Sequence, residues 1–386
     1  MDKLYFKEEH LMLREMVREF AVKEIRPLSS DIDKKSIFPK ENIKKMAELG
    51  LMGIPWEEKY SGNGMDTRAL VIAIEEIGKE CASTAATMMA HTSLGTAPIA
   101  IFGTDSQKLK YLPALASGKK IGAFGLTEPN AGSDAGSTKT KAIKYKDEYI
   151  INGQKAFCTN AGVASTIIIT AQIEDNGQNK GIGAFIVDSE TDGLKIGEPE
   201  NKMGWKGSDT RSVYFEDMRI SKDALLGSPS KGFKQFLQTL TGGRITIGAL
   251  SLGTAQGAYD RAVKYSFERE AFSKKINQFQ GISYKLSNMA LKIQASKHLV
   301  YHAAWKKDMG MNIIKEAAMA KLYSSESAME ICTEAIQVLG GYGYIHEYDV
   351  ERYFRDAKIL EIGEGTSEIQ RIIISREILK SYQPNE

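Results

Sequence analysis

The chain has 386 residues, of which 42% are hydrophobic and 26% are charged, and its formal net charge is +2 at pH 7. This length predicts two or three domains and a large buried core. Lysines and acidic residues are mixed along the sequence, which argues against nucleic-acid and membrane-surface binding. No stretch has the length of a membrane span, and the N-terminus resembles neither a signal peptide nor a transit peptide. We therefore expect a cytoplasmic protein without nucleic-acid or membrane partners.

The cysteines and histidines give no sign of a disulfide framework or a metal site. The three cysteines are far apart in the sequence and form no CxxC pair, which indicates a reducing compartment. The five histidines include one pair at helical spacing, His298 and His302. A metal ion needs more ligands than this pair offers, so no metal is expected.

Residues 1–120 are predicted to form an all-helical N-terminal domain. Apolar residues between Phe6 and Ile25 recur at the spacing of an amphipathic helix, and Pro27 is expected to end that helix. Further helices of this domain are predicted over residues 39–49, 67–80, 85–101 and 106–115.

Residues 121–228 are predicted to form a middle β domain. Short runs rich in β-branched and aromatic residues alternate here with Gly, Asn and Asp, and Asn152–Gly153 has the form of a hairpin turn. Several short strands at this spacing are typical of a sandwich or a barrel. The expected strands include residues 149–151, 166–170, 184–187 and 213–215.

Residues 229–386 are predicted to form a C-terminal four-helix bundle. Long helical patterns with short links are typical of bundles. The expected helices cover residues 233–240, 245–268, 279–306 and 313–339, with a closing helix after Ser367. The predicted fold class is therefore α+β, in the order helical domain, β domain and helical bundle.

The stretch Glu361–Gln370 places one carboxylate, Glu364, between two glycines just before the closing helix. Glycine permits close approaches that a Cβ would forbid, so Glu364 could be directed into a cavity. Ser367 and Gln370 have the spacing of a capping box. Taken alone, the stretch is explained better by a solvated acid near a helix N-terminus.

Four other stretches carry groups suited to a nucleotide-like ligand. Residues 124–134 offer backbone N–H groups and a hydroxyl at a turn, which suits a phosphate or a ring carbonyl. Residues 157–162 place an aromatic beside a hydroxyl. A cation and aromatics in residues 269–280 suit pyrophosphate and adenine, and residues 337–344 run from a helix into glycines. Each stretch alone is explained as well by an ordinary turn, strand end or helix end.

Together, in this order, the motifs resemble those of the acyl-CoA dehydrogenases. The resemblance extends from the first helix to about Lys380. Its most specific parts are Thr127–Pro129 with Gly132–Asp134, Arg269–Gln280, Gln337–Gly341, Phe354–Lys358 and Glu364–Thr366.

The resemblance implies an FAD enzyme that desaturates an acyl-CoA thioester between its α and β carbons. Glu364 would be the base that removes the α proton, and flavin N5 would accept the β hydride. The backbone N–H of Glu364 would help to stabilise the developing enolate. The residues implied for binding the substrate are Ser133, Thr241, Arg244 and Gly365.

The resemblance also implies two groups of FAD-binding residues. One group would surround the flavin and its neighbourhood: Phe124, Leu126, Thr127, Gly132, Ser133, Phe157, Thr159, Thr366 and Glu368. The other would complete the FAD site from a neighbouring subunit: Arg269, Phe272, Phe279, Gln280, Gln337, Gly340 and Gly341. This sharing implies a homotetramer of paired dimers, and an electron-transferring flavoprotein would reoxidise the enzyme.

The sequence departs from the family pattern at the acyl and CoA sites. Gly363 replaces a tyrosine common in relatives, which enlarges or reshapes the acyl pocket. Thr241 replaces an aspartate, so the CoA contact that this aspartate usually makes is not expected here, although Arg244 is retained; Ser273 replaces a glycine. Members with the base on the bundle helix carry an acid beside this arginine; the neighbour here is Gly243. This leaves Glu364 as the only base.

Residues 91–97, expected to form the wall of the acyl pocket, contain no arginine. A neutral, short acyl chain is therefore favoured over a dicarboxylic one, with branched and cyclic chains left open. An enoyl-CoA reductase working in the reverse direction remains an alternative. An oxygen-using oxidase or monooxygenase and a non-catalytic flavin scaffold fit less well, because Glu364 is present and oxidases tend to be longer.

Overall fold

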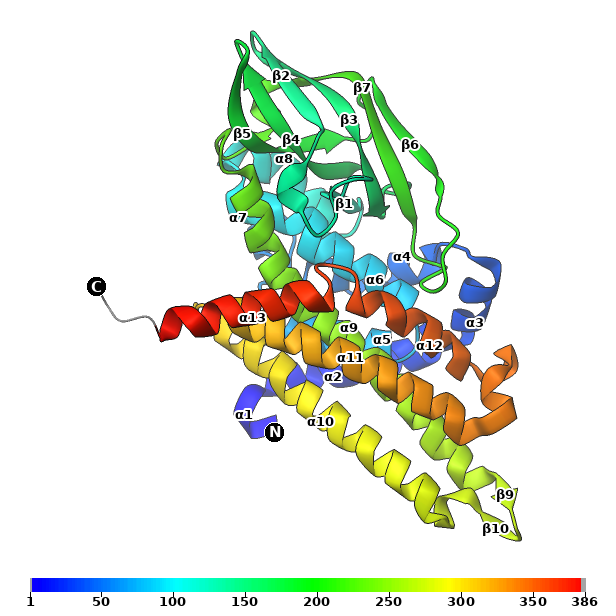
Figure 1. Cartoon of the computed structure of the whole chain (residues 1–386). Helices are drawn as coiled ribbons and strands as arrows, with labels where there is room; N and C mark the ends of the chain where they lie inside the picture. The colour runs from blue at the N-terminus through cyan, green and yellow to red at the C-terminus, as the bar shows by residue number, and fades with distance from the viewer. Residues whose placement is uncertain (1, 383–386) are drawn as a thin grey trace.

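The N-terminal part of the chain is helical, as predicted, in the computed structural model, which describes residues 2–382 (Figure 1). The expectation that Pro27 ends the first helix is wrong. A π-helical segment, η1 (Ala21–Ile25), leads directly into the next helix, and Pro27 lies in its first turn, where a missing N–H costs nothing. The helices are α1 (Asp2–Tyr5), α2 (Glu8–Phe20), α3 (Arg26–Lys35), α4 (Lys40–Glu48), α5 (Thr67–Gly78), α6 (Ala82–Met89), α7 (Ala97–Phe102) and α8 (Asp105–Ala116).

The helix predicted over residues 85–101 is interrupted by a buried π-helical segment, η4 (Ala90–Thr96). This segment lies between the β part and the long helix α9 (Gly232–Glu268). A Cβ built on Gly95 would lie 2.4 Å from the carbonyl carbon of Gly122, and one built on Gly243 would lie 3.3 Å from Leu94 Cδ2. Interruptions of this kind often mark functional sites, and this one brings the start of the sheet close to α9.

The middle part forms one eight-stranded sheet in the order β6-β7-β3-β2-β4-β5-β8, with β1 paired to β4. The β1–β4 and β2–β4 pairs are parallel and the other pairs are antiparallel. The strands are β1 (Gly122–Gly125), β2 (Lys141–Tyr145), β3 (Glu148–Thr159), β4 (Thr166–Asp175), β5 (Gln178–Asp188), β6 (Leu194–Pro199), β7 (Thr210–Ser221) and β8 (Leu225–Leu226).

The hairpin turn expected at Asn152–Gly153 is wrong. Strand β3 continues through this dipeptide, and its register with β7 shifts between Ile151 and Gly153. Such a shift is a β-bulge, in which an extra residue bends the strand without ending it. The pairing with β2 on one side and β7 on the other therefore overrides the local turn signal.

The C-terminal part consists of long helices, as predicted, but α9 is one continuous helix rather than two. The expected break near Gly242–Gly243 does not occur, because buried packing outweighs the low helix propensity of glycine. The other elements are the hairpin β9 (Glu270–Ala271) and β10 (Lys274–Lys275), and the helices α10 (Gln280–Asp308), α11 (Ile314–Leu339), α12 (Val350–Lys358) and α13 (Ser367–Ser381).

One apolar cluster joins the N-terminal helices to the C-terminal helices. It includes Val17 of α2 and Ile72 of α5 together with Leu250 of α9, Tyr301 of α10 and Ile331 of α11. The sheet has one cluster of its own, and a third cluster joins its other side to α7, α8 and α9 through Ile168, Ile99, Leu112 and Phe236. The two helical parts therefore share a core. Within residues 2–382, no helix is both long enough and apolar enough to cross a membrane.

A buried ion pair fixes the segment that follows β1. The ammonium of Lys155 donates to Glu128 Oε1 at 2.7 Å, to Thr170 Oγ1 at 3.1 Å and to the carbonyl of Leu126 at 3.3 Å. Burial raises the pKa of Glu128, but hydrogen bonds led by the one from Lys155 outweigh it and lower the pKa to about 2. The pair thus ties the loop after β1 to the middle of the sheet.

Replacement of Lys155 by methionine should lower the free energy of unfolding by about 3–5 kcal/mol, because Glu128 would be left as a buried charge without its partner. Urea unfolding followed by circular dichroism measures this loss. Lys195→Met is the matched control: its exposed pair with Glu216 joins two strands of the same sheet and is worth less than about 1 kcal/mol. Equal losses in the two variants would contradict the importance of the buried pair.

Candidate active site

Glu364 lies in the turn that precedes α13, and its backbone conformation is unusual. Its φ is 54° and that of Gly365 is 95°. A non-glycine residue in the left-handed region costs of order 1–3 kcal/mol, and such residues gather at functional sites. The side-chain amide of Gln370 holds the turn by donating to the carbonyls of Glu364 at 3.3 Å and Gly365 at 2.8 Å.

The capping box expected from Ser367 and Gln370 is wrong. Thr366 is the N-cap of α13, and its hydroxyl accepts from the backbone N–H of Ile369 at 3.4 Å. Ser367 is the first residue of the helix. Gln370 binds the carbonyls of the left-handed turn instead of a cap N–H, so its role is to support the conformation of Glu364.

The carboxylate of Glu364 lies directly against α9. A Cβ built on Gly243 would lie 1.9 Å from Glu364 Oε2, so only glycine leaves room at this position. Both carboxylate oxygens are buried, and neither has a hydrogen-bond partner among residues 2–382. Unpartnered buried polar atoms are rare because they are costly, so this carboxylate is a candidate for a functional group.

Burial raises the pKa of Glu364 to about 7, against the opposing effect of the nearby cations Arg244 and Lys321. A carboxyl group that titrates near neutral pH can accept and return a proton efficiently. The geometry and the titration of Glu364 therefore both suit a general base.

Three of the four residues expected to bind the substrate, Thr241, Arg244 and Gly365, lie beside this carboxylate, whereas Ser133 lies in the exposed loop after β1. Arg244 is buried beside Gly243, and its Nη1 donates to Thr241 Oγ1 at 3.2 Å. Its Nε has no partner in the described part of the chain. Burial lowers the pKa of Arg244 and Glu364 raises it, but an arginine stays charged in proteins. The structure thus brings Thr241, Arg244, Gly365 and Glu364 together.

The structure also brings together the two stretches expected beside the flavin ring. Leu126 and Thr127 follow β1, and the carbonyl of Thr127 accepts from the N–H of Ala156 in β3 at 2.8 Å. Phe157 and Thr159 come next in β3. Phe157 has a φ of 55° at a second register shift and is 66% exposed. An exposed aromatic held in this strained conformation is available for a ligand.

The other residues of this group occupy different positions. The ring of Phe124 stacks on Phe236 of α9 at 4.2 Å between centroids and is partly buried. Gly132 and Ser133 are exposed in the loop after β1, and a Cβ on Gly132 would meet no atom within 4 Å. Glu368 is exposed in the first turn of α13.

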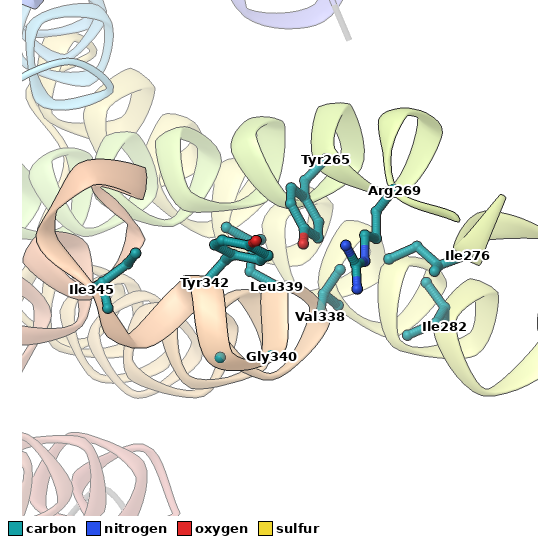
Figure 2. Close-up of a pocket in the computed structure, with 10 residues that line it drawn as sticks. Tyr265, Arg269, Ile276, Ile282, Val338, Leu339, Gly340, Tyr342 and Ile345 are labelled. Carbon is teal, nitrogen blue, oxygen red and sulfur yellow. The ribbon is translucent and has the colours of Figure 1, made fainter. Parts of the chain in front are cut away.

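The group expected to act from a neighbouring subunit forms a separate pocket, shown in Figure 2. The pocket has a volume of about 540 Å³ and is lined by Arg269, Gly340 and Gly341 among others. The Arg269 guanidinium and the Tyr265 ring point into the same space and face the end of α11 (Figure 2). The remaining residues of this group, all near the pocket in sequence, are Phe272, which is 90% exposed, Phe279, Gln280 and Gln337.

The pocket is far from Glu364 within one chain. Arg244 lies in the first half of α9 and Arg269 immediately follows its end. At a rise of about 1.5 Å per residue the two arginines are about 37 Å apart. The hairpin β9–β10 beside the pocket accordingly lies at the end of the bundle remote from the sheet (Figure 1). One dinucleotide cannot span this distance, so the two groups of residues cannot hold the same molecule within one chain.

Comparisons with known proteins agree with the resemblance seen in the motifs. The models for the N-terminal, middle and C-terminal domains of acyl-CoA dehydrogenases match residues 7–119, 123–218 and 230–379. A probable acyl-CoA dehydrogenase of Bacillus subtilis is 52% identical over 374 residues, which cover 97% of this chain and 98% of the relative. The chain belongs to the acyl-CoA dehydrogenase family.

Two further relatives are similar over nearly their whole length. A 3-(aryl)acrylate reductase of Clostridium sporogenes is 44% identical over 377 residues, which cover 98% of this chain and 100% of the relative. The solved structure of butyryl-CoA dehydrogenase from Megasphaera elsdenii has a TM-score of 0.94 and 42% identity, with 97% of this chain and 99% of that chain covered. The predicted fold class is confirmed.

Acyl-CoA dehydrogenases are oxidoreductases that act on a CH–CH bond with FAD as cofactor, and this chain is such an enzyme. The residues present fit FAD. A Cβ placed on Gly340 or Gly341 would meet no atom within 4 Å, so a phosphate can approach the backbone there, and Arg269 supplies a cation. Among the described residues, no group of three or more His, Cys, Asp or Glu side chains is arranged to hold a metal ion.

Two features of this acyl-CoA dehydrogenase site were missed by the motifs. Lys321 of α11 is fully buried and acts electrostatically on Glu364; its signal was a lysine on the apolar face of a helix. Gly243 was interpreted as a helix break and as the absence of a competing acid, whereas it also provides the space for the carboxylate of Glu364.

Substitution of Gly243 by alanine should lower the rate of FAD reduction by acyl-CoA at least about 100-fold, because the Cβ displaces a reacting group by an ångström or more. Stopped-flow absorbance at the flavin band measures the rate. Helix α9 itself should tolerate the change, since alanine favours helices more than glycine does.

Gly242→Ala is the matched control for this substitution. Its Cβ would meet only the flexible end of Lys307, with Nζ at 3.2 Å, so the rate of FAD reduction should stay close to that of the wild type. Near-normal reduction by the Gly243→Ala variant would contradict the placement of Glu364 against α9.

Proposed function

We propose that the protein catalyses the FAD-dependent α,β-dehydrogenation of a short-chain acyl-CoA to the 2-enoyl-CoA, with Glu364 as the base that removes the α proton. The observation that carries the proposal is the Glu364 carboxylate, which is buried, has no hydrogen-bond partner in residues 2–382 and has a pKa raised to about 7. An α proton of a thioester is too weakly acidic for a carboxylate in water, so a base with a raised pKa is needed.

The backbone of the same turn can stabilise the negative charge that develops on the thioester oxygen. Within residues 2–382, the N–H groups of Glu364 and Gly365 donate no hydrogen bond to the protein. Preorganised backbone donors of this kind are a major source of transition-state stabilisation in enzymes. The turn thus supplies both a base for the α proton and donors for the carbonyl oxygen.

FAD supplies the oxidising power of the reaction by accepting the β hydride. Its isoalloxazine ring would lie among Leu126, Thr127, Phe157 and Thr159, with Ser133 near both the ring and CoA. Thr241 and Arg244 would contact the substrate beside Glu364. The α proton goes to Glu364 and the β hydride to FAD, which leaves a double bond in the acyl chain.

A neutral, short acyl group is supported by the wall of the site and by a relative. His91 is buried in η4, with its ring nitrogens bonded to the carbonyl of Leu115 at 3.1 Å and the N–H of Gly122 at 3.0 Å. Burial lowers its pKa to about 4, so it is neutral and residues 91–97 present no cation to an acyl chain. The similar enzyme of Megasphaera elsdenii is a butyryl-CoA dehydrogenase.

The distance of about 37 Å along α9 supports an assembly in which two copies share their FAD sites, and the family resemblance implies a homotetramer built from paired dimers. A second copy would bring its pocket of Arg269, Gly340 and Gly341 to the flavin site of the first, together with Phe272, Phe279, Gln280 and Gln337. An electron-transferring flavoprotein would then reoxidise the enzyme.

A second candidate function is the reverse reaction, the reduction of an enoyl-CoA. The relative from Clostridium sporogenes is a 3-(aryl)acrylate reductase, and Glu364 can return a proton to the α carbon as readily as remove one. Anaerobic titration distinguishes the two functions. A dehydrogenase bleaches its flavin with acyl-CoA, whereas a reductase that has been reduced chemically regains its flavin absorbance with enoyl-CoA.

Replacement of Glu364 by glutamine should reduce the rate of flavin bleaching by butyryl-CoA by about 10²–10⁴-fold while the protein keeps its bound FAD, because glutamine cannot accept the α proton. Stopped-flow absorbance measures the rate and the flavin spectrum reports FAD. Glu361→Gln, in the same segment, removes a carboxylate that pairs with Lys358 and should leave the rate nearly unchanged. Fast bleaching by the Glu364 variant would refute the assignment of the base.

The same variant should also be more stable than the wild type above pH 7. The folded protein binds the proton of Glu364 more tightly than the unfolded chain does, so ionisation lowers stability as the pH rises from about 4 through about 7. Removing the carboxylate should raise the free energy of unfolding by up to about 3 kcal/mol at alkaline pH. The gain should vanish in acid. A variant that is at least as stable as the wild type at every pH loses bleaching for a reason other than unfolding.

Introduction of tyrosine at Gly363 should narrow the range of acyl groups. A Cβ at this position would have one atom within 4 Å, the carbonyl oxygen of Ile359 at 3.4 Å, so the backbone leaves space for the start of a side chain. Relative to butyryl-CoA, branched and aryl-substituted acyl-CoAs should lose about tenfold or more in kcat/KM. Gly363→Ala controls for the backbone, and an unchanged preference in the tyrosine variant would show that this position does not border the acyl group.

A further inference from the structure

Lys321 is a buried cation that the reaction as described above does not use. It lies in α11, its side chain is fully buried, and its Nζ has no hydrogen-bond partner in the described part of the chain. Its helical neighbours Ala317, Ala318 and Ala320 are buried alanines. An ammonium group without a partner is expensive inside a protein, so its presence on this apolar face needs an explanation.

The charged groups that act on Lys321 come from several elements around its helix. They are Glu364 and Glu361 in the segment before α13, Arg244 on α9, Glu326 on α11 itself, and Glu368 on α13. Three of these carboxylates are already engaged. Glu361 pairs with Lys358, Glu326 pairs with Arg371 at 2.8 Å, and Glu368 accepts a hydrogen bond from Thr366.

Glu364 is the carboxylate of this set that has no partner of its own within residues 2–382. Helix α11, which carries the cation, packs against α13 and against the turn Ile359–Glu361 that precedes Glu364, so the unpartnered cation and the unpartnered carboxylate lie on adjacent elements. Burial lowers the pKa of Lys321 to about 8, and Glu364 is the largest of the influences that raise it. Lys321 is thus still protonated at neutral pH.

We propose that Lys321 is a positioning residue for the proton transfer, whose buried ammonium keeps the Glu364 carboxylate ionised so that the base is ready when the substrate arrives. The proposal rests on the proposed role of Glu364. Lys321 acts through Glu364 and does not touch the substrate. Arg244 on α9 contributes to the same effect, so loss of Lys321 weakens the effect without abolishing it.

The first test is the pH profile of kcat/KM for anaerobic flavin bleaching by butyryl-CoA. In Lys321→Met, which has a similar volume and no charge, the inflection that reports Glu364 should move upward by about one pH unit or more, with the plateau at high pH retained. Lys321→Arg keeps the charge and should restore the wild-type inflection. Lys315→Met removes a lysine from the first turn of the same helix and should leave the profile unchanged.

A second test measures the interaction without the reaction. Unfolding midpoints of the FAD-bound wild type, Lys321→Met, Glu364→Gln and the double variant form a double-mutant cycle between about pH 5 and pH 8. The two substitutions should be coupled above the inflection of Glu364 and independent below it. Additivity at every pH, or an unchanged kinetic profile in Lys321→Met, would overturn the proposal.

The two tests fail in different ways. If Glu364 is not the base, bleaching persists in Glu364→Gln while the coupling with Lys321 is still measured. If Glu364 is the base and Lys321 is only a packing residue, Lys321→Met lowers the unfolding midpoint by the same amount at every pH and leaves the kinetic inflection in place. Lys321→Gln provides the same measurements if the methionine variant does not fold.

Discussion

The contact between the Glu364 carboxylate and the surface of α9 constrains the residues and the backbone conformation on both sides of the candidate site. The carboxylate reaches this surface only because position 243 has no side chain and because Glu364 adopts a φ of 54°. Gln370 donates hydrogen bonds to the carbonyls of the turn, and Lys321 of α11 adds a cation that acts on Glu364. Strain, burial and the low helix propensity of glycine all lower stability. They occur together where a group must stay reactive, which is the usual relation between function and local instability.

The local sequence was sufficient for the fold class and for the identity of the turn that carries Glu364. It failed where tertiary contacts override local preference. Gly242–Gly243 is a good helix break in isolation, yet α9 continues because its buried faces pack on other helices, chiefly α5, α10 and α11. Asn152–Gly153 is a good hairpin turn, yet β3 is paired on both sides. Pro27 lies in the first turn of a helix instead of ending one, because the π-helical segment η1 runs directly into α3.

The motifs proposed a set of residues for the candidate site but not their arrangement. Spacing in the sequence does not show that Arg269 lies at the far end of the helix that carries Arg244, or that Glu364 and Gly243 touch. Lys321 carried a weak signal, a charge on an apolar helical face, and only its burial and lack of a partner within residues 2–382 give that signal meaning. Residues defined by contacts between elements remain hidden from motif analysis, because each motif is read along one element.

The shared core of the N-terminal and C-terminal helices makes the sheet an insertion into a single helical body. During synthesis the first helices leave the ribosome with an apolar face whose partners, α9 to α11, are more than a hundred residues away in the sequence. The sheet can close its own core in that interval, whereas the early helices must wait. The body that holds the reactive carboxylate is therefore completed last, and its first half depends on protection from aggregation until then.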